Sequence, residues 1–204
     1  MNIYLVRHGE TLQNIEKVFY GSIDCELTEK GLLQCEKLKN FFNDKNIDMV
    51  YLSTMKRTLD TTKNLLGNKF SIMNEKNKVV KDSRINERDF GDFEGKDYDT
   101  LLKEYPNQCK IWQEDWIGFI PPKGESYRQL YDRVVEFFEE ILNKPYNNIL
   151  VVAHSGVIRA IYSYIMDKNM DLFWKFASKN GDVSIIKYEY GNLFIDGIIH
   201  NDLL

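Results

Sequence analysis

Two histidines of this chain stand at matching places in the sequence, and each is a candidate for chemistry. His8 ends the apolar run 3–6, and His154 ends the apolar run 149–153. Arg7 precedes the first of them, and each histidine is followed by a glycine within two positions. An imidazole can attack as a nucleophile or move a proton, and a guanidinium binds phosphate oxygens two at a time. The two motifs therefore predict a site that handles an anionic group.

Arg57 is a further candidate for this site. It falls in the first turn of a helix that we expect after the strand 48–53, with Thr54 as the N-cap. The start of a helix offers unpaired N–H groups and the positive end of the helix dipole, which together suit an anion. Ser155 and Gly156 offer the same groups directly after the second histidine. Two arginines, two imidazoles and these helix starts predict a phosphate pocket.

Each of these residues also has a simpler interpretation. A histidine at a strand end is often a structural residue, and Arg57 alone would be a solvated residue on a helix. A zinc site is another alternative, but the sequence has no HxH or HExxH pattern and no cysteine at ligand spacing. We therefore expect no metal and no other cofactor. The combination of His8, His154 and the arginines at equivalent strand ends favours the functional interpretation.

Alternating strands and helices must position these groups. Residues 2–7 are apolar without alternation, which is typical of a buried strand, and Ser126 opens a helix with the S-x-x-Q form of a capping box. The same patterns place strands at 48–53, 79–81, 149–153, 183–190 and 193–199, helices at 28–44, 54–67, 126–142 and 157–166, and irregular segments at 12–27 and 82–125.

This order predicts an α/β protein with three α/β/α layers, a mostly parallel central sheet, an antiparallel edge strand and a small cap region. In such sheets ligands bind beyond the carboxyl ends of the strands, where both histidines lie. We expect the helix at 28–44 to bury an apolar face of Leu32, Leu38, Phe41 and Phe42.

The bulk composition narrows the classes of function. A chain of 204 residues fits one domain, which we place at 1–204 with a cap or lid at about 83–125. The net charge of −4 argues against a nucleic-acid partner, and no apolar run approaches the roughly 20 residues that span a bilayer. Cys25, Cys35 and Cys109 are widely spaced, which indicates reduced thiols in a cytoplasmic protein, with Cys35 a small core residue.

Longer blocks of the sequence resemble a known family. The stretch Arg7-His8-Gly9-Glu10-Thr11, with Asn14 three residues on, is similar to the signature of the histidine phosphatase superfamily, also called phosphoglycerate-mutase-like. The resemblance continues in the same order and covers nearly the whole chain, through Gly21, Leu27–Gly31, Ser53–Arg57 with Thr61, Asn86–Gly95 and Val151–Arg159.

The resemblance implies a phosphatase that acts on a small-molecule phosphomonoester through a phosphohistidine. It makes His8 the nucleophile, and Glu87 the residue that protonates the leaving oxygen and then activates water. The phosphoryl oxygens would be held, and their developing charge neutralised, by Arg7, Arg57 and His154. Three more positions would complete the substrate-binding residues: Asn14, Gly21 and Ser155.

Other residues near these blocks are expected to act structurally. Asn14 either donates to the phosphate or starts a helix. The remaining expectations are that Glu10 and Glu94 support neighbouring segments, that Asp89 and Asp92 shape the loop carrying Glu87, that Arg159 forms an ion pair, and that His200 has no role in the site.

The region 110–116 bears on the substrate. Phosphoglycerate mutases of this family have paired arginines there that bind the substrate carboxylate, and this chain has no arginine in it. With the P-x-G-E-S segment at 122–126, the region is instead similar to alpha-ribazole phosphatases, which remove the 5′-phosphate of a benzimidazole riboside in cobalamin assembly. Four aromatic residues would either stack on such a heterocycle or only pack the cap against the core: Trp112, Trp116, Phe119 and Tyr127. A broad-specificity phosphatase, a mutase and a non-catalytic binding module of this fold are the alternatives.

Overall fold

A six-stranded sheet forms the centre of the molecule in the computed structural model, which describes residues 1–204. The strands are β1 (Asn2–Arg7), β2 (Met49–Leu52), β3 (Val79–Lys81), β4 (Asn148–Ala153), β5 (Val183–Glu189) and β6 (Asn192–Ile199). Their order across the sheet is β3-β2-β4-β1-β5-β6. The first four strands in this order run parallel, and the β5–β6 hairpin adds an antiparallel edge beside β1. The expected class of fold and its mostly parallel sheet are confirmed.

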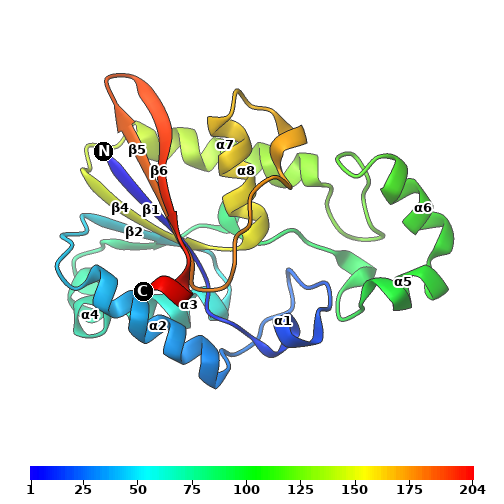
Figure 1. Cartoon of the computed structure of the whole chain (residues 1–204), viewed down its shortest axis with the longest axis horizontal. Coiled ribbons are helices and arrows are strands. Elements are labelled where there is room, and N and C mark those ends of the chain that lie inside the picture. Colours follow the sequence, from blue (N-terminus) through cyan, green and yellow to red (C-terminus); the bar gives the residue numbers. More distant parts are fainter.

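Helices cover both faces of this sheet (Figure 1). One face carries α2 (Glu29–Phe42), α3 (Lys56–Leu66) and α4 (Asn68–Glu75), and the other carries α7 (Tyr127–Leu142) and α8 (Ser155–Ile165). The β1 strand shows why its apolar run is unbroken. Ile3 and Leu5 enter the core under α7 and α8, whereas Tyr4 and Val6 enter the core under α2 and α3. Successive side chains of a strand point to opposite faces, so a strand buried on both sides is apolar at every position.

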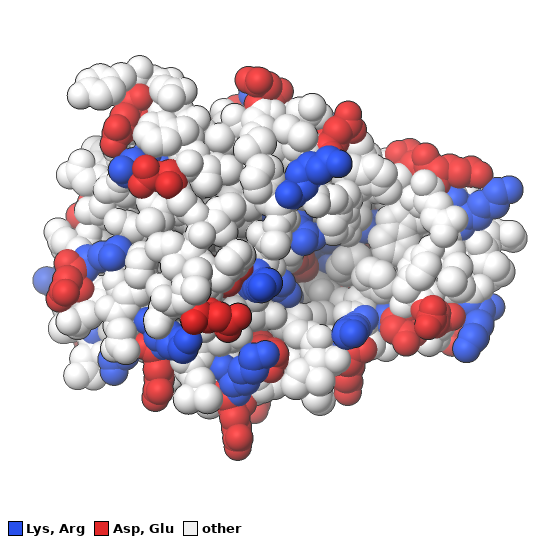
Figure 2. All heavy atoms as spheres, viewed as in Figure 1, with Lys and Arg blue, Asp and Glu red and all other residues white.

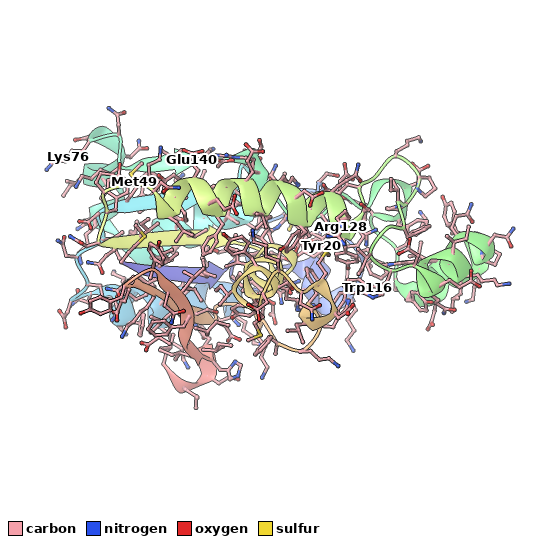
Figure 3. All side chains as sticks on the ribbon, turned by 90° about the horizontal axis from the view of Figure 1, so that it is seen from above. Tyr20, Met49, Lys76, Trp116, Arg128 and Glu140 are labelled. Atoms are coloured by element: carbon pink, nitrogen blue, oxygen red, sulfur yellow. The ribbon has the colours of Figure 1, made fainter.

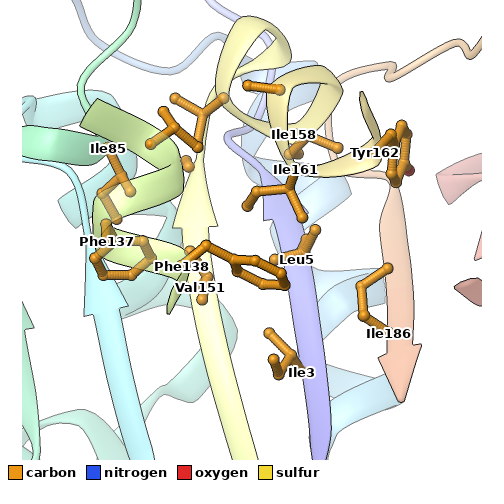
Figure 4. Close-up of a cluster of buried hydrophobic side chains, with 14 of the residues drawn as sticks. Ile3, Leu5, Ile85, Phe137, Phe138, Val151, Ile158, Ile161, Tyr162 and Ile186 are labelled. Atoms are coloured by element: carbon orange, nitrogen blue, oxygen red, sulfur yellow. The ribbon is translucent and has the colours of Figure 1, made fainter. Parts of the chain in front are cut away.

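The larger core lies between the sheet and α7 with α8. Figure 4 shows Leu5 and Val151 of the sheet facing Phe137, Phe138 and Ile161 of the helices. The α7 helix begins as expected, because the Ser126 hydroxyl accepts from the Gln129 N–H and the Gln129 side chain accepts from the Ser126 N–H. This core fixes α7 and α8 against the sheet, and with them the start of α8 beside β4.

The cap extends beyond the carboxyl ends of the parallel strands. It contains α5 (Tyr98–Glu104), α6 (Pro106–Glu114) and the short 3₁₀ turns η1 (Ser83–Ile85) and η2 (Gly91–Phe93). Two further turns, η3 (Met170–Leu172) and η4 (Asn201–Leu203), lie outside it. The cap has a small core of its own, formed by Phe90, Phe93, Leu101, Cys109 and Phe119. Seen from above in Figure 3, Tyr20 and Trp116 lie where the cap meets the body.

Five local expectations are wrong. The segment 82–125, expected to be irregular, contains the helices α5 and α6. The segment 12–27 contains a helix, α1 (Leu12–Glu16), because Thr11 and Asn14 form a capping box. Leu32, which was expected to be buried, is 44 % exposed. The buried face of α2 includes Cys35 instead, in phase with Leu38 and Phe42. The N-cap of α3 is Met55 rather than Thr54, and α8 begins two residues early, at Ser155. All three cysteines are free thiols, and Cys35 is fully buried. No helix has both the length and the apolar character needed to cross a membrane.

Candidate active site

The two strand-end histidines meet at the carboxyl edge of the sheet. β1 and β4 are parallel neighbours, and their register sets Arg7 opposite Ala153. The next residues along the two strands, His8 and His154, therefore lie side by side, with ring centroids 5.1 Å apart. Both side chains are buried, and the His8 N–H donates to the Ala153 carbonyl at 3.0 Å. The sheet register thus brings together two residues that are 146 positions apart in the sequence.

The ring of His8 is held in its neutral form with one fixed tautomer. Its Nδ1 lies 2.8 Å from the Gly9 carbonyl oxygen, and since a carbonyl only accepts, Nδ1 carries the proton. Nε2 then has a free lone pair and makes no hydrogen bond within the protein. Burial, followed by the nearby charges of Arg57 and Arg7, holds the pKa of His8 well below its usual value. At neutral pH the imidazole is therefore uncharged, as attack on phosphorus requires.

His154 is fixed in the opposite tautomer. Its Nδ1 accepts from Arg57 Nε–H at 3.3 Å, so the ring proton sits on Nε2, which donates to Ser53 Oγ at 2.7 Å. Burial and Arg57 lower the pKa of His154 well below its usual value as well. Both of its nitrogens are occupied by the protein, so the observed role of His154 is to orient Arg57. A direct contact with a phosphoryl oxygen stays a prediction, and it requires one of these two bonds to open.

Arg57 is completely buried and tied to the loop after α1. Its Nη1 donates to Ile23 O at 2.9 Å and its Nη2 to Gly21 O at 2.8 Å. Gly21 belongs to the site through its backbone, and the loop there leaves no room for a side chain. A Cβ at this position would lie 1.7 Å from the carbonyl oxygen of Arg88. Because a guanidinium has five donors in all, one N–H on each Nη has no hydrogen-bond partner within the protein.

Arg7 is the second cation of the site and is partly buried. Its Nη1 donates to Ser178 O at 2.5 Å, whereas its Nε is buried without any partner in the protein. Burial lowers the pKa of Arg7 from its ordinary value, yet an arginine remains charged at neutral pH. An unpartnered, buried N–H on a cation costs free energy unless a ligand accepts it. The geometry therefore suits an anion bound beside His8.

Glu87 reaches the same place from the cap. Its Oε2 accepts from the Gly156 N–H at 3.1 Å and its Oε1 accepts from the Arg88 N–H at 2.9 Å. Gly156 leaves room for this contact, because a Cβ on it would lie 2.3 Å from Glu87 Oε1 and would displace the carboxyl group. The carboxyl group is thus held at the start of α8, two residues beyond His154. A proton donor at this point could serve a leaving group in the cavity.

A cavity of about 280 Å³ is lined by Arg7 and Glu87, whereas the buried side chains of His8, Arg57 and His154 lie behind its lining. Figure 2 shows it as a hollow between the body and the cap, with basic side chains at its rim. Its polar lining comes from Arg7, Asn14, Glu87, Ser155, Gly156 and Arg159, and its apolar lining from Val18, Phe19, Tyr20, Phe90, Tyr127, Phe173 and Trp174. The cavity is therefore polar at the phosphate end and aromatic around the space left for a leaving group.

The four aromatic residues considered from the sequence divide into two groups. Tyr127 lines the cavity, whereas Trp112, Trp116 and Phe119 pack within the protein. Trp112 stacks on Phe119 with centroids 5.7 Å apart. The packing interpretation thus holds for three of them. The lining includes instead aromatic residues that the sequence did not single out, above all Trp174 from the loop after η3.

Arg159 does not form the expected ion pair. Its Nε donates to Phe176 O at 3.2 Å, and its guanidinium lies 4.7 Å from the centre of the Trp174 ring. No carboxylate neutralises it, and it lines the cavity. The sequence held a usable signal, since residue 159 follows Ser155 by four positions and so shares its face of α8. Trp174 had no comparable signal.

Asn14 and Asn180 link the phosphate end to the loop before β5. Asn14 Oδ1 accepts from the Thr11 N–H at 3.2 Å and from Asn180 Nδ2 at 3.0 Å. The helix-start role of Asn14 is therefore real, and its own amide N–H groups remain available to the cavity. Asn180 Nδ2 also donates to the His8 carbonyl at 3.0 Å. Asn180 is a supporting residue that the sequence did not reveal.

The remaining expectations concern supporting residues. Glu94 accepts backbone N–H groups of Gly21, Ser22 and Ile23, and so holds the loop that contacts Arg57. Glu10 pairs with Lys30. Other residues show local roles: Asp89 accepts from the Gly91 N–H, Asp92 pairs with Lys123, and His200 pairs with Asp182 outside the cavity. No three His, Cys, Asp or Glu side chains are grouped as metal ligands would be.

The fold and the geometry together define an enzyme-like phosphate site at the switch point of an α/β sheet. The family model of the histidine phosphatase superfamily (branch 1) matches residues 3–199, and the chain belongs to that family. It is a phosphatase of this superfamily, since its relatives and structural neighbours include phosphatases over nearly the full length.

Three comparisons illustrate this. The chain is 30 % identical to phosphoserine phosphatase 1 of Hydrogenobacter thermophilus, over 93 % of this chain and 87 % of that protein. It is 29 % identical to the adenosylcobalamin/alpha-ribazole phosphatase of Escherichia coli, over 91 % of this chain and 89 % of that protein. The crystal structure of the alpha-ribazole phosphatase from Shigella flexneri superposes with a TM-score of 0.90 at 26 % identity, covering 98 % of this chain and 97 % of that one.

Proposed function

We propose that the chain hydrolyses a small phosphomonoester through a phosphohistidine on His8. The observation that carries this proposal is the fixed tautomer of His8, whose Nδ1 proton is held by the Gly9 carbonyl while Nε2 keeps its lone pair. Arg7 and Arg57 lie close enough for their charges to lower the pKa of His8, and each has N–H groups to spare. A neutral nucleophile beside two cations suits attack on a phosphate dianion.

The proposed reaction has two steps. In the first, Nε2 attacks phosphorus, the bond to the leaving oxygen breaks, and Glu87 gives its proton to that oxygen. In the second, a water attacks phosphorus from the side that the leaving group vacated, and Glu87 takes a proton from it. The N–P bond then breaks, its electron pair returns to Nε2, and inorganic phosphate leaves. Arg7, Arg57, Asn14 and Ser155 would hold the phosphoryl oxygens through both steps.

For the substrate, we propose alpha-ribazole 5′-phosphate. Aromatic side chains of Phe19, Tyr20, Tyr127 and Trp174 surround the space for the leaving group, and a flat heterocycle can stack on such faces. The likeness to alpha-ribazole phosphatases supports this choice. One aromatic stack contributes only about 0.5–1.5 kcal/mol, so stacking alone supports a preference of roughly tenfold.

The test compares substrates on the purified protein by kcat/KM. Alpha-ribazole 5′-phosphate, 3-phosphoglycerate and p-nitrophenyl phosphate are assayed for released phosphate, and the second also for 2-phosphoglycerate. We expect the riboside to be preferred over 3-phosphoglycerate. Efficient isomerisation would show a mutase, equal and slow hydrolysis of all three would show a broad-specificity phosphatase, and no turnover at all would show a binding module.

One observation favours a second candidate, phosphoserine. The Nη atoms of Arg159 have no protein partner, and a free guanidinium at the rim of the cavity suits a carboxylate. The likeness to a phosphoserine phosphatase supports this alternative. Phosphoserine therefore belongs in the same panel, and a higher kcat/KM for it than for the riboside would replace the first choice.

A further inference from the structure

The segment that carries Glu87 has little regular structure of its own. Residues 86–90 lie between the turns η1 and η2, and no strand or helix contains them. Backbone carbonyls of such a segment must find donors elsewhere, because an unpaired buried carbonyl is costly. Two carbonyls of this stretch and one carbonyl of η1 accept from a single side chain, that of Arg133 on α7.

Arg133 uses all five of its N–H groups at this one place. Nη1 donates to the carbonyl oxygens of Arg84 and Asn86, at 2.7 Å each, and Nη2 donates to the carbonyl oxygen of Glu87 at 3.1 Å. The two remaining N–H groups, on Nε and Nη2, bind the two carboxylate oxygens of Glu125. A planar guanidinium can donate to all five of these acceptor sites, whereas a lysine has only three donors, all on one nitrogen atom.

Glu125 completes the support from the other side. Its Oε1 accepts from the Asp89 N–H at 3.1 Å, and its own N–H donates to the Asp89 carbonyl at 2.9 Å. Both charged side chains are largely sheltered, with 22 % exposed for Arg133 and 18 % for Glu125. A bidentate pair of this kind is stronger and more directional than an exposed ion pair. The backbone at 84, 86, 87 and 89 is therefore held by one pair of side chains.

We propose that Arg133, paired with Glu125, is a positioning residue for the proton donor Glu87. The inference rests on the proposed role of Glu87 in protonating the leaving oxygen. Arg133 contacts the carbonyl of Glu87 rather than its carboxyl group, and it reaches neither Arg7 nor His8. Loss of the pair displaces the proton donor but leaves the nucleophile and the phosphate cations, which belong to other elements, in place.

A leaving-group comparison tests this proposal. The value of kcat/KM covers the steps up to release of the leaving group, so it reports protonation of that group. An alkyl phosphate needs the proton, whereas p-nitrophenyl phosphate leaves with little protonation. For Arg133→Lys we expect kcat/KM for the alkyl phosphate to fall by about 10- to 100-fold, because a displacement near 1 Å can cost this much. The fall for p-nitrophenyl phosphate should be several times smaller.

Arg84→Met is the matched control for lost stability. This substitution also breaks a charged network, because the Arg84 side chain pairs with Asp82, Glu136 and Glu140. The Arg84 side chain makes no contact with Glu87. We expect the substitution to lower the melting temperature without any leaving-group dependence. Arg128→Met, on the exposed side of α7 (Figure 3), controls for the loss of an arginine from this helix.

Glu87→Gln separates the two proposals. If it produces no leaving-group dependence, the proposed role of Glu87 fails, and the inference fails with it. If Glu87→Gln shows the dependence and Arg133→Lys, folded by circular dichroism, does not, only the positioning role of Arg133 is overturned. An equal fall for both substrates in Arg133→Lys would also overturn it, because that result indicates general loosening of the fold.

Discussion

Gly156 gives a sharp test of the position of Glu87, the proposed proton donor. An alanine Cβ at this position would lie 2.3 Å from Glu87 Oε1 and 3.0 Å from Leu130 Cδ2. Ordinary contact begins at 3.4 Å, so the carboxyl group must retreat by about 1 Å, while the leucine adjusts by a few tenths. The backbone of residue 156 is ordinary helix, so the substitution adds no conformational strain. The added methyl group therefore acts mainly on Glu87.

We expect Gly156→Ala to lower kcat/KM for an alkyl phosphomonoester by about 100-fold, since a shift of this size in a reacting group costs that much. p-Nitrophenyl phosphate should be affected much less, because its leaving group needs little protonation. Folding stability should change by less than about 1 kcal/mol, because alanine favours a helix over glycine and offsets the crowding. The measurements are steady-state kinetics on both substrates and a urea titration.

Gly197→Ala is the matched control, since a Cβ there meets no heavy atom within 4 Å. It should leave kinetics and stability as they are. Full alkyl phosphatase activity in Gly156→Ala would refute the reasoning, because the methyl group cannot fit while Glu87 keeps its observed position. An equal loss for the alkyl and the aryl ester would refute it as well, since it would place the damage at phosphate binding.

Three further predictions follow from the site. Reaction with labelled substrate and rapid quenching should leave a label on the protein that survives base and is released by acid, as a phosphoramidate requires. The His8→Ala variant should lose both the label and turnover. Normal turnover in this variant would exclude His8 as the nucleophile. The pKa values of His8 and His154 are held low by burial first and by Arg57 next. Below about pH 6.5 the unfolded chain therefore binds protons on these rings that the folded chain does not bind. Their contribution to the free energy of unfolding is intact above that pH and is lost below it. Between pH 7.5 and 5.5 the free energy of unfolding should fall by up to about 3 kcal/mol from the two rings, less in His8→Gln, and a flat profile in urea titrations would contradict this. Arg159→Met should lower kcat/KM for phosphoserine by about tenfold or more, since a charged hydrogen bond contributes about 1.5–3 kcal/mol. The kcat/KM for alpha-ribazole 5′-phosphate should stay unchanged. Equal effects on both substrates would show that Arg159 binds no carboxylate.

The parts of the structure that were predictable from sequence are those governed by local pattern. The capping box at Ser126, the apolar run of β1 and the hairpin at the end of the chain each follow from neighbours within a few residues. The proximity of His8 and His154 followed from a general rule, that parallel strands present their carboxyl ends at one edge.

The parts that were not predictable depend on contacts between distant segments. Asn180 donates to the carbonyl of His8 across 172 positions, and no local pattern indicates that partner. Trp112 and Trp174 look alike as sequence, yet one packs inside the cap and the other lines the cavity. Which of them touches a ligand is decided by how the loop after η3 folds over α8, which is a tertiary property. Arg159 was misjudged because an ion pair was assumed where an aromatic ring and a backbone carbonyl hold the side chain.

Charge in this site acts on binding and on the nucleophile together. Arg57 donates through Nε to His154, and its positive charge also lowers the pKa of His8. Burial is the larger cause of that low pKa, and the charges of Arg57 and Arg7 act in the same direction. Each cation beside the proposed nucleophile therefore favours the neutral form of its ring. The site can gather positive charge for a phosphate dianion without protonation of the ring as a competing outcome.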